Sequence, residues 1–195
     1  MVVLVTFEEA QHVLVDGGCA EIERGMTEEE FSRVERQFGF RFPPDLRTFL
    51  AAGLPVSRGW VDWRRIDEAA IRGRLDWPLE GICFDIEHNR FWLQEWGERP
   101  SKLEAAFDVA RRAVRAAPVL IPICGHRYIP VEPCEEGNPI FSIYQTDIIY
   151  YGADLMDYLH NEFGYYFGRA AYAITKTPRR VPFWARLVEE NGGVC

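Results

Sequence analysis

The sequence lacks the short motifs by which many enzymes are recognised. It contains no Gly-rich phosphate loop, no GxSxG nucleophile elbow, no HExxH zinc motif and no dinucleotide-binding fingerprint. It also has no CxxC pair, no internal repeat and no low-complexity segment. The residues therefore point to no particular reaction, and we expect neither a bound cofactor nor catalysis.

Long apolar runs are missing as well. The N-terminal stretch Met1–Ala10 contains an apolar run of only five residues with no basic segment before it, which argues against a signal peptide and against a membrane span. No later segment reaches the length of a membrane span without charged residues. We therefore expect no contact with a membrane.

Cysteine is scarce and irregularly spaced. The chain has five, an odd number that does not suit a framework of disulfides. They are Cys19, Cys83, Cys124, Cys134 and Cys195. Reduced thiols fit this pattern better, and they indicate a cytoplasmic protein.

The charge balance is acidic. The chain has 30 Asp and Glu residues against 22 Lys and Arg, so its net charge is −8. Such a surface repels nucleic-acid phosphates and favours either simple solubility or a cationic partner, so we expect no nucleic-acid binding. A short basic segment at residues 175–180 is expected to be a solvated linker. The length of 195 residues, 48% of them hydrophobic, suits one domain with a substantial core.

Helix starts are signalled by capping boxes and by proline. The three capping boxes are Thr6–Glu9, Thr27–Glu30 and Ser101–Glu104. The helices that they predict end at Val15, before Gly39 and at Ala116. Pro44 starts a further helix that ends at Gly53, and Pro182 opens a short last helix.

Short β-rich segments dominate the second half of the chain. The predicted strands are Val119–Ile123, Ile140–Gln145 and Asp147–Tyr151, and a helix follows from about Ala153 to Gly164. Earlier, apolar and polar residues alternate from Ile82 to Glu87, which predicts a half-buried strand there and a returning strand at 91–93. Helices and strands do not alternate regularly. We therefore expect an α+β fold, with a central, mostly antiparallel twisted sheet flanked by helices.

Two sets of residues carry a family resemblance. The first is the pair of helices within Thr27–Gly53, joined by Phe42-Pro43-Pro44-Asp45-Leu46. The second is the strand Leu120-Ile121-Pro122-Ile123 with the strands and last helix that follow it. Together they resemble the SUKH superfamily, which includes bacterial immunity proteins and fungal regulators of cell-wall synthesis. The resemblance covers Gly25 to Phe163. It implies a SUKH-like domain at residues 25–164, an N-terminal helical extension at 1–24, and a C-terminal extension at 165–195 that packs on the core.

The resemblance also implies a function. Immunity proteins of this family neutralise toxins, often nucleases, by direct association. The chain departs from the family at Ala52-Gly53-Leu54, where Asn-Gly is common, and at Gly125–Tyr128, where a Gly-rich turn and an acidic residue on the next strand are usual. These departures leave the partner open. The implied function is that of a non-enzymatic protein-binding domain, with immunity-type inhibition of a toxin as the leading hypothesis and a regulatory scaffold as the alternative.

Tryptophan is concentrated between Trp60 and Trp96, where five occur within 37 positions. Most are expected to pack in the core, but tryptophan is also favoured in protein interfaces. Acidic residues lie near the last two, so this region could form an acidic, aromatic face for a basic toxin such as a nuclease. The predicted contact residues are Asp85, Glu87, Trp92, Glu95, Trp96 and Tyr128.

Cys124, His126 and Cys134 allow a competing interpretation, as metal ligands or as a nucleophile with its base. Their C-x-H-x7-C spacing is not that of a standard zinc site and lacks a fourth ligand, and no oxyanion loop accompanies Cys124. We therefore expect no metal and no catalytic residue. A small Cys/His-dependent hydrolase or metal enzyme is the less favoured alternative. An exposed edge strand or the C-terminal helix could support a homodimer.

Overall fold

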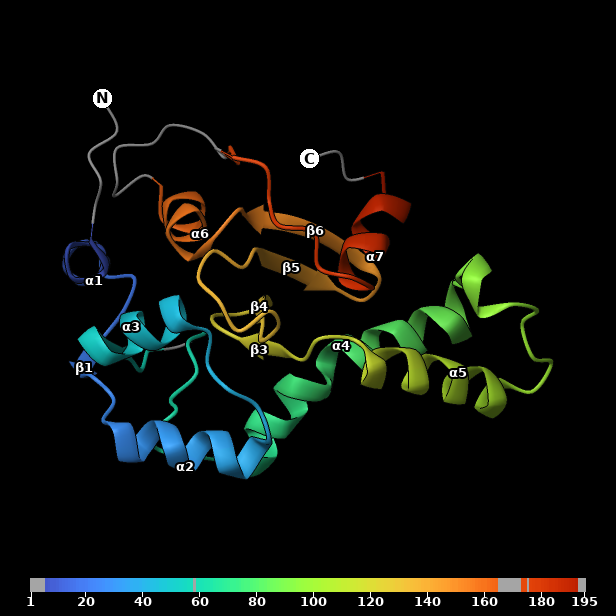
Figure 1. Cartoon of the computed structure of the whole chain (residues 1–195), viewed down its shortest axis with the longest axis horizontal. Coiled ribbons are helices and arrows are strands. Elements are labelled where there is room, and N and C mark those ends of the chain that lie inside the picture. Colours follow the sequence, from blue (N-terminus) through green and yellow to red (C-terminus); the bar gives the residue numbers. More distant parts are fainter. Residues whose placement is uncertain (1–5, 58, 165–172, 175, 193–195) are drawn as a thin grey trace.

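A four-stranded antiparallel sheet lies at the centre of the fold (Figure 1). The computed structural model describes residues 6–57, 59–164, 173–174 and 176–192. Within them the predicted α+β class is confirmed, and the central sheet has the strand order β3-β4-β5-β6. In chain order the elements are α1 (Phe7–Asp16), β1 (Ile22–Arg24), α2 (Glu28–Phe38), α3 (Pro44–Ala52), β2 (Gly53–Pro55), α4 (Glu68–His88), the 3₁₀ helix η1 (Gln94–Trp96), α5 (Leu103–Ala116), β3 (Leu120–Pro122), β4 (Arg127–Pro130), β5 (Ile140–Tyr144), β6 (Asp147–Gly152), α6 (Leu155–Glu162) and α7 (Trp184–Glu190).

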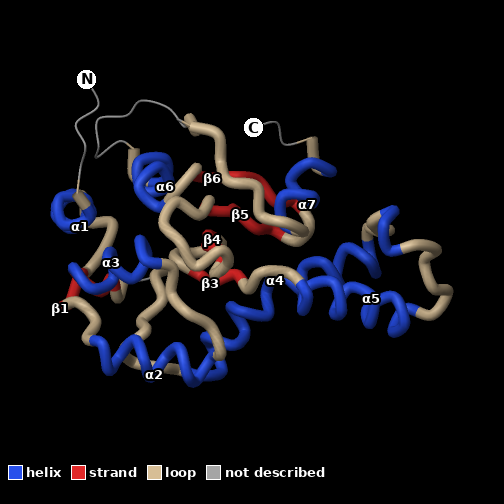
Figure 2. Tube along the Cα trace, viewed as in Figure 1, coloured by secondary structure: helices blue, strands red, loops and turns tan. Residues whose placement is uncertain are grey.

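The central sheet separates two apolar cores. Side chains alternate between the two faces of a strand, so neighbouring residues of β3, β4 and β5 enter different cores. Ile121 and Ile129 pack in a core with α1, α2, α3 and α6. Leu120, Tyr128 and Phe141 pack in a core with α4, α5 and α7. Figure 2 shows α1–α3 on one side of the sheet, with α4 and α5 extending away on the other.

Local signals in the sequence located most of these elements. The capping boxes at Thr6 and Thr27 are both formed, and Gly39 ends α2 in the left-handed conformation with φ 76°. The predicted strands at 119–123, 140–145 and 147–151 correspond to β3, β5 and β6. The third capping box is wrong, because α5 begins after Lys102 and no side chain caps it.

Helix α4 overturns the prediction of a strand at 82–87. The helix runs from Glu68 to His88 through Pro78 and Gly81, which the sequence suggests as breakers. Gly81 lies against the β5–β6 turn: a Cβ at this position would come within 2.6 Å of the Gln145 Cα. Only glycine permits this close approach, so tertiary packing overrides the weak helix propensity. The predicted strand at 91–93 is also absent, since these residues lead directly into η1.

The C-terminal part of the chain packs on the second core. Trp184, Leu187 and Val188 of α7 are buried there, and the Trp184 indole donates to the Pro118 carbonyl at 2.7 Å. The basic residues of this region are ion-paired rather than solvated alone: Lys176 contacts Asp154, and Arg180 contacts Glu189 at 2.8 Å. Of the predicted C-terminal extension, residues 165–172, 175 and 193–195, which include Cys195, lie outside the described residues, as does the apolar run at 1–5. None of the described helices combines the length and apolarity needed to cross a membrane.

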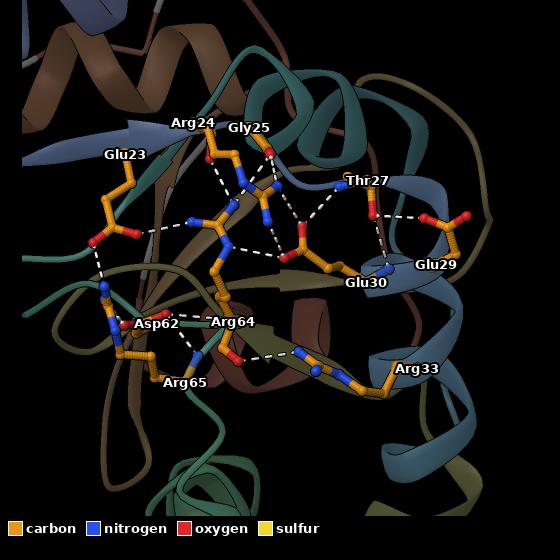
Figure 3. A network of polar contacts seen from close by, with 10 residues as sticks. All are labelled: Glu23, Arg24, Gly25, Thr27, Glu29, Glu30, Arg33, Asp62, Arg64 and Arg65. Atoms are coloured by element: carbon orange, nitrogen blue, oxygen red, sulfur yellow. Dashed lines mark hydrogen bonds and ion pairs between the residues drawn. The ribbon is translucent and has the colours of Figure 1, made fainter.

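A polar network joins β1, the start of α2 and the loop before α4 (Figure 3). The Arg64 guanidinium donates to Glu30 at 2.8 Å, to Glu23 at 2.9 Å and to the Arg24 carbonyl at 2.7 Å. Hydrogen bonds from Arg64 and Arg24 lower the pKa of the Glu30 carboxyl from 4.5 to about 2. The network holds the N-terminal strand and α2 against the segment that leads into α4.

Candidate protein-binding surface

Helices α4 and α5 form a hairpin that projects away from the sheet (Figure 1). The two helices pack side by side, and the loop that contains η1 joins them at the far end. One side of α4 carries Pro78, Ile82 and Ile86, which are buried against the sheet and α5. The opposite side is therefore free to face solvent.

That solvent side carries the largest exposed aromatic residues of the hairpin. Trp77 and Phe84 are each 44% exposed, although large aromatic side chains are usually more buried. Seven positions apart, they lie on one face of a 3.6-residue helix, and Glu80 and Glu87 fall beside them on the same face. We call these four residues the outer α4 face.

The outer α4 face is acidic. Two of its four residues, Glu80 and Glu87, carry exposed carboxylates, and the other two are aromatic. Within the described residues, no lysine or arginine forms an ion pair with Glu80 or Glu87. By contrast, Glu104 and Asp108 on α5 are both paired with Arg111, at 2.6 Å and 2.9 Å. Among the described residues, Glu80 and Glu87 thus have no lysine or arginine partner, although the His88 ring lies 3.6 Å from Glu87, and both stand beside the exposed aromatic rings.

The predicted residues at the end of the hairpin have mainly a packing role. Trp92 and Trp96 are half-buried and meet edge to face, with ring centroids 5.1 Å apart. The Trp92 indole donates to the Gly97 carbonyl at 2.8 Å, which closes the loop. Glu95 is exposed and lies 3.7 Å from Arg186 of α7. The two tryptophans support the end of the hairpin and present only part of their surface, whereas Glu95 remains exposed.

Asp85 is not on the surface, so the prediction that it faces outward with Glu87 is wrong. On a strand the two carboxylates would share a face, but on a helix residues two apart do not. Asp85 is buried, and its carboxylate accepts hydrogen bonds from the Thr146 backbone N–H and the Thr146 hydroxyl. It attaches α4 to the β5–β6 turn, whereas Glu87 remains exposed.

Tyr128 is also buried, which corrects its placement among the surface residues. Its ring lies in the second core, and its hydroxyl donates to the Arg74 carbonyl at 2.9 Å. Burial raises the pKa of the Tyr128 hydroxyl to about 12. Tyr128 therefore joins β4 to α4 inside the molecule.

The Cys124–Cys134 loop does not assemble a reactive site in the described residues. Burial raises the pKa of the Cys124 thiol to about 11, so the thiol stays protonated at neutral pH. Burial and the charge of Arg127 lower the pKa of His126. Cys134 is exposed beside Phe42 instead of facing Cys124. Within the described part of the chain, no three His, Cys, Asp or Glu side chains are grouped to hold a metal ion.

Sequence reasoning missed Phe84 because of the strand assigned to 82–87, and it left Trp77 in a tryptophan group that was expected to lie mostly in the core. That assignment places Phe84 inside with Ile82 and Ile86. A helix over these residues would place Phe84 opposite Ile82 and Ile86. Phe84 would then share a face with Trp77, since the two are seven positions apart. The seven-residue spacing of the two aromatic residues was the available signal.

Comparisons with known proteins assign no family. No protein-family model matches the chain, and no curated protein or solved structure is significantly similar to it. The SUKH resemblance therefore stays a prediction.

Proposed function

We propose that this chain is a non-enzymatic protein-binding domain that neutralises a basic, nuclease-like toxin by direct association. The observation that carries the proposal is the outer α4 face. Two exposed aromatic rings, Trp77 and Phe84, stand beside two carboxylates, Glu80 and Glu87, that no arginine or lysine of the described chain neutralises. The resemblance to immunity proteins adds the expectation that the bound partner is inhibited.

The chemistry of this face suits a basic partner. Burying an aromatic ring supplies apolar contact area worth about 25 cal/mol per Å², and exposed aromatics are frequent hot spots of protein interfaces. Unpaired carboxylates attract a cationic surface and accelerate encounter with it. A nuclease must present cationic groups to hold phosphate, so it offers the complementary charge. The cysteine content supports a reducing compartment, and we propose the cytoplasm as the site of action.

Affinity capture from the native cell, quantified by mass spectrometry, tests this proposal. Phe84→Ala or the double variant Glu80→Lys/Glu87→Lys should lower recovery of a basic partner by about tenfold, the scale of a single interface hot spot. Val15→Ala and Glu8→Lys are matched controls on α1, where both residues are exposed. They should recover the partner as the unaltered chain does.

Two outcomes would count against parts of the proposal. Equal recovery of the basic partner by the α4 variants and the α1 variants would show that the outer α4 face does not bind it. A stoichiometric partner that keeps its full activity in the complex would favour the regulatory-scaffold alternative over inhibition.

A further inference from the structure

A groove lined by apolar and basic residues, unlike the acidic outer α4 face, lies at the C-terminal end of α2. Two hollows form it, of about 570 Å³ beside Cys134 and about 320 Å³ beside Trp184. Val119 lines both and is 47% exposed, so a large aliphatic side chain stands uncovered where the hollows meet. Phe40 and Val131 form the apolar wall of the larger hollow. We call this the Val119 groove.

Two arginines of the larger hollow form no ion pair with any described residue. Arg36 and Arg41 line it, both are exposed, and neither forms an ion pair within the described residues. Glu35 shares the wall, but its carboxylate is held by Arg47 at 3.0 Å and also accepts the Phe42 N–H at 3.2 Å. The remaining carboxylate of this hollow is Glu132, so the unpaired charge is positive.

The smaller hollow continues this pattern. Arg115 lines it and has no ion pair in the described chain, whereas Arg72 is bound to Glu68 at 2.8 Å. Asp76 is the one carboxylate among its lining residues. Along the whole groove, three unpaired arginines face two unpaired carboxylates. The groove thus carries a positive excess, although the chain as a whole has a net charge of −8.

We propose that the Val119 groove binds an acidic, extended peptide segment of a partner protein. Carboxylates of the segment would pair with Arg36 and Arg41, since guanidinium groups bind carboxylates through paired hydrogen bonds. An apolar side chain of the segment would cover Val119, and removal of both apolar surfaces from water would favour binding. Two open hollows in series suit a segment of chain. The smaller hollow borders the outer α4 face, since Asp76 and Pro78 flank Trp77, but the unpaired charge of the groove is of the opposite sign.

Selection from a phage-displayed library of twelve-residue peptides on the intact protein tests the proposal. Recovered peptides should be enriched in Asp and Glu next to an aliphatic or aromatic residue. A synthetic peptide from the selection should bind Arg36→Ala and Arg41→Ala about tenfold more weakly, the effect of losing one charge-assisted pair. Arg112→Ala is the matched control, because Arg112 is exposed and lies outside both hollows. Its affinity should be unchanged.

Cysteine labelling gives a second readout within the same molecule. The selected peptide should slow alkylation of exposed Cys134, which lines the larger hollow, and leave Cys83 on the α4–α5 hairpin unaffected. The variants Phe84→Ala and Glu87→Lys should bind the peptide normally, which separates this site from the proposed function. A selection that returns no binder, binders without acidic enrichment, or binders insensitive to both arginine variants overturns the inference.

Discussion

The Asp85 carboxylate holds Thr146 by two hydrogen bonds, from the backbone N–H at 2.8 Å and from the hydroxyl at 2.6 Å. The residues are 61 positions apart, and the contact attaches the last turn of α4 to the β5–β6 turn. It also fixes the rotation of α4 about its own axis. Because Asp85 faces the sheet, Trp77 and Phe84 must face solvent.

Replacing Asp85 by alanine should destabilise the protein. The substitution leaves the half-buried Thr146 N–H and hydroxyl without their acceptor, which costs about 2 kcal/mol for a charged hydrogen-bond partner. Urea unfolding measures the loss. Glu87→Ala, two residues away and exposed, should change the free energy of unfolding by less than about 0.5 kcal/mol. Equal effects of the two substitutions would contradict the placement of Asp85.

Two glycines of α4 should respond in opposite directions to alanine. At Gly81 a Cβ would come within 2.6 Å of the Gln145 backbone, so Gly81→Ala should cost about 1–3 kcal/mol by forcing α4 and the turn apart. At Gly73 nothing lies within 4 Å of the added Cβ, so Gly73→Ala should stabilise the helix by about 0.5–1 kcal/mol. Thermal unfolding of both variants decides the matter, and a shared sign would show that α4 does not pack as described.

Tyr128 of β4 and Tyr158 of α6, both buried, should also differ in how they respond to phenylalanine. The Tyr158 hydroxyl is buried without a hydrogen-bond partner among the described residues, so Tyr158→Phe should leave stability unchanged or raise it by up to ~1 kcal/mol. The Tyr128 hydroxyl donates to Arg74, so Tyr128→Phe should lower stability by about 1 kcal/mol. Chemical denaturation of the two variants in parallel provides the comparison. Destabilisation by Tyr158→Phe would reveal a partner for that hydroxyl.

Glu30 should make stability depend on pH in the acid range. Its folded-state pKa of about 2 lies below the ordinary 4.5, so its ion pair with Arg64 stabilises the fold fully above pH 4.5. This contribution is lost as the pH falls from about 4.5 towards 2. The difference in unfolding free energy between the unaltered chain and Glu30→Gln should therefore shrink over that range. A difference that stays constant from pH 4.5 to 2 would contradict this role of Glu30.

The sequence predicted best where structure depends on neighbouring residues. The boxes at Thr6 and Thr27 are formed by residues three positions apart, and they are present as expected. The hairpin of β5 and β6 likewise depends on a short apolar segment on either side of a turn. These interactions are encoded within a few residues, so they can be recognised without the rest of the fold.

Prediction from the sequence failed where contacts between distant segments determine the secondary structure. The alternation of Ile82, Phe84 and Ile86 fits a strand as well as part of a helix, and Pro78 and Gly81 favour the strand. What selects the helix is the close packing of Gly81 and Asp85 on the turn at Gln145 and Thr146, more than sixty positions away. The candidate site could not be located correctly for the same reason, since the helix determines that Phe84 is outside and Asp85 inside.

Photo-crosslinking in the native cell tests directly whether the outer α4 face contacts a basic partner protein. The residue p-benzoylphenylalanine is placed at position 84 on the outer α4 face and, as a control, at position 15 on α1, where Val15 is similarly exposed. We expect a covalent adduct with one basic protein from position 84 and none from position 15. An adduct with that protein from position 15 but not from position 84 would contradict this expectation.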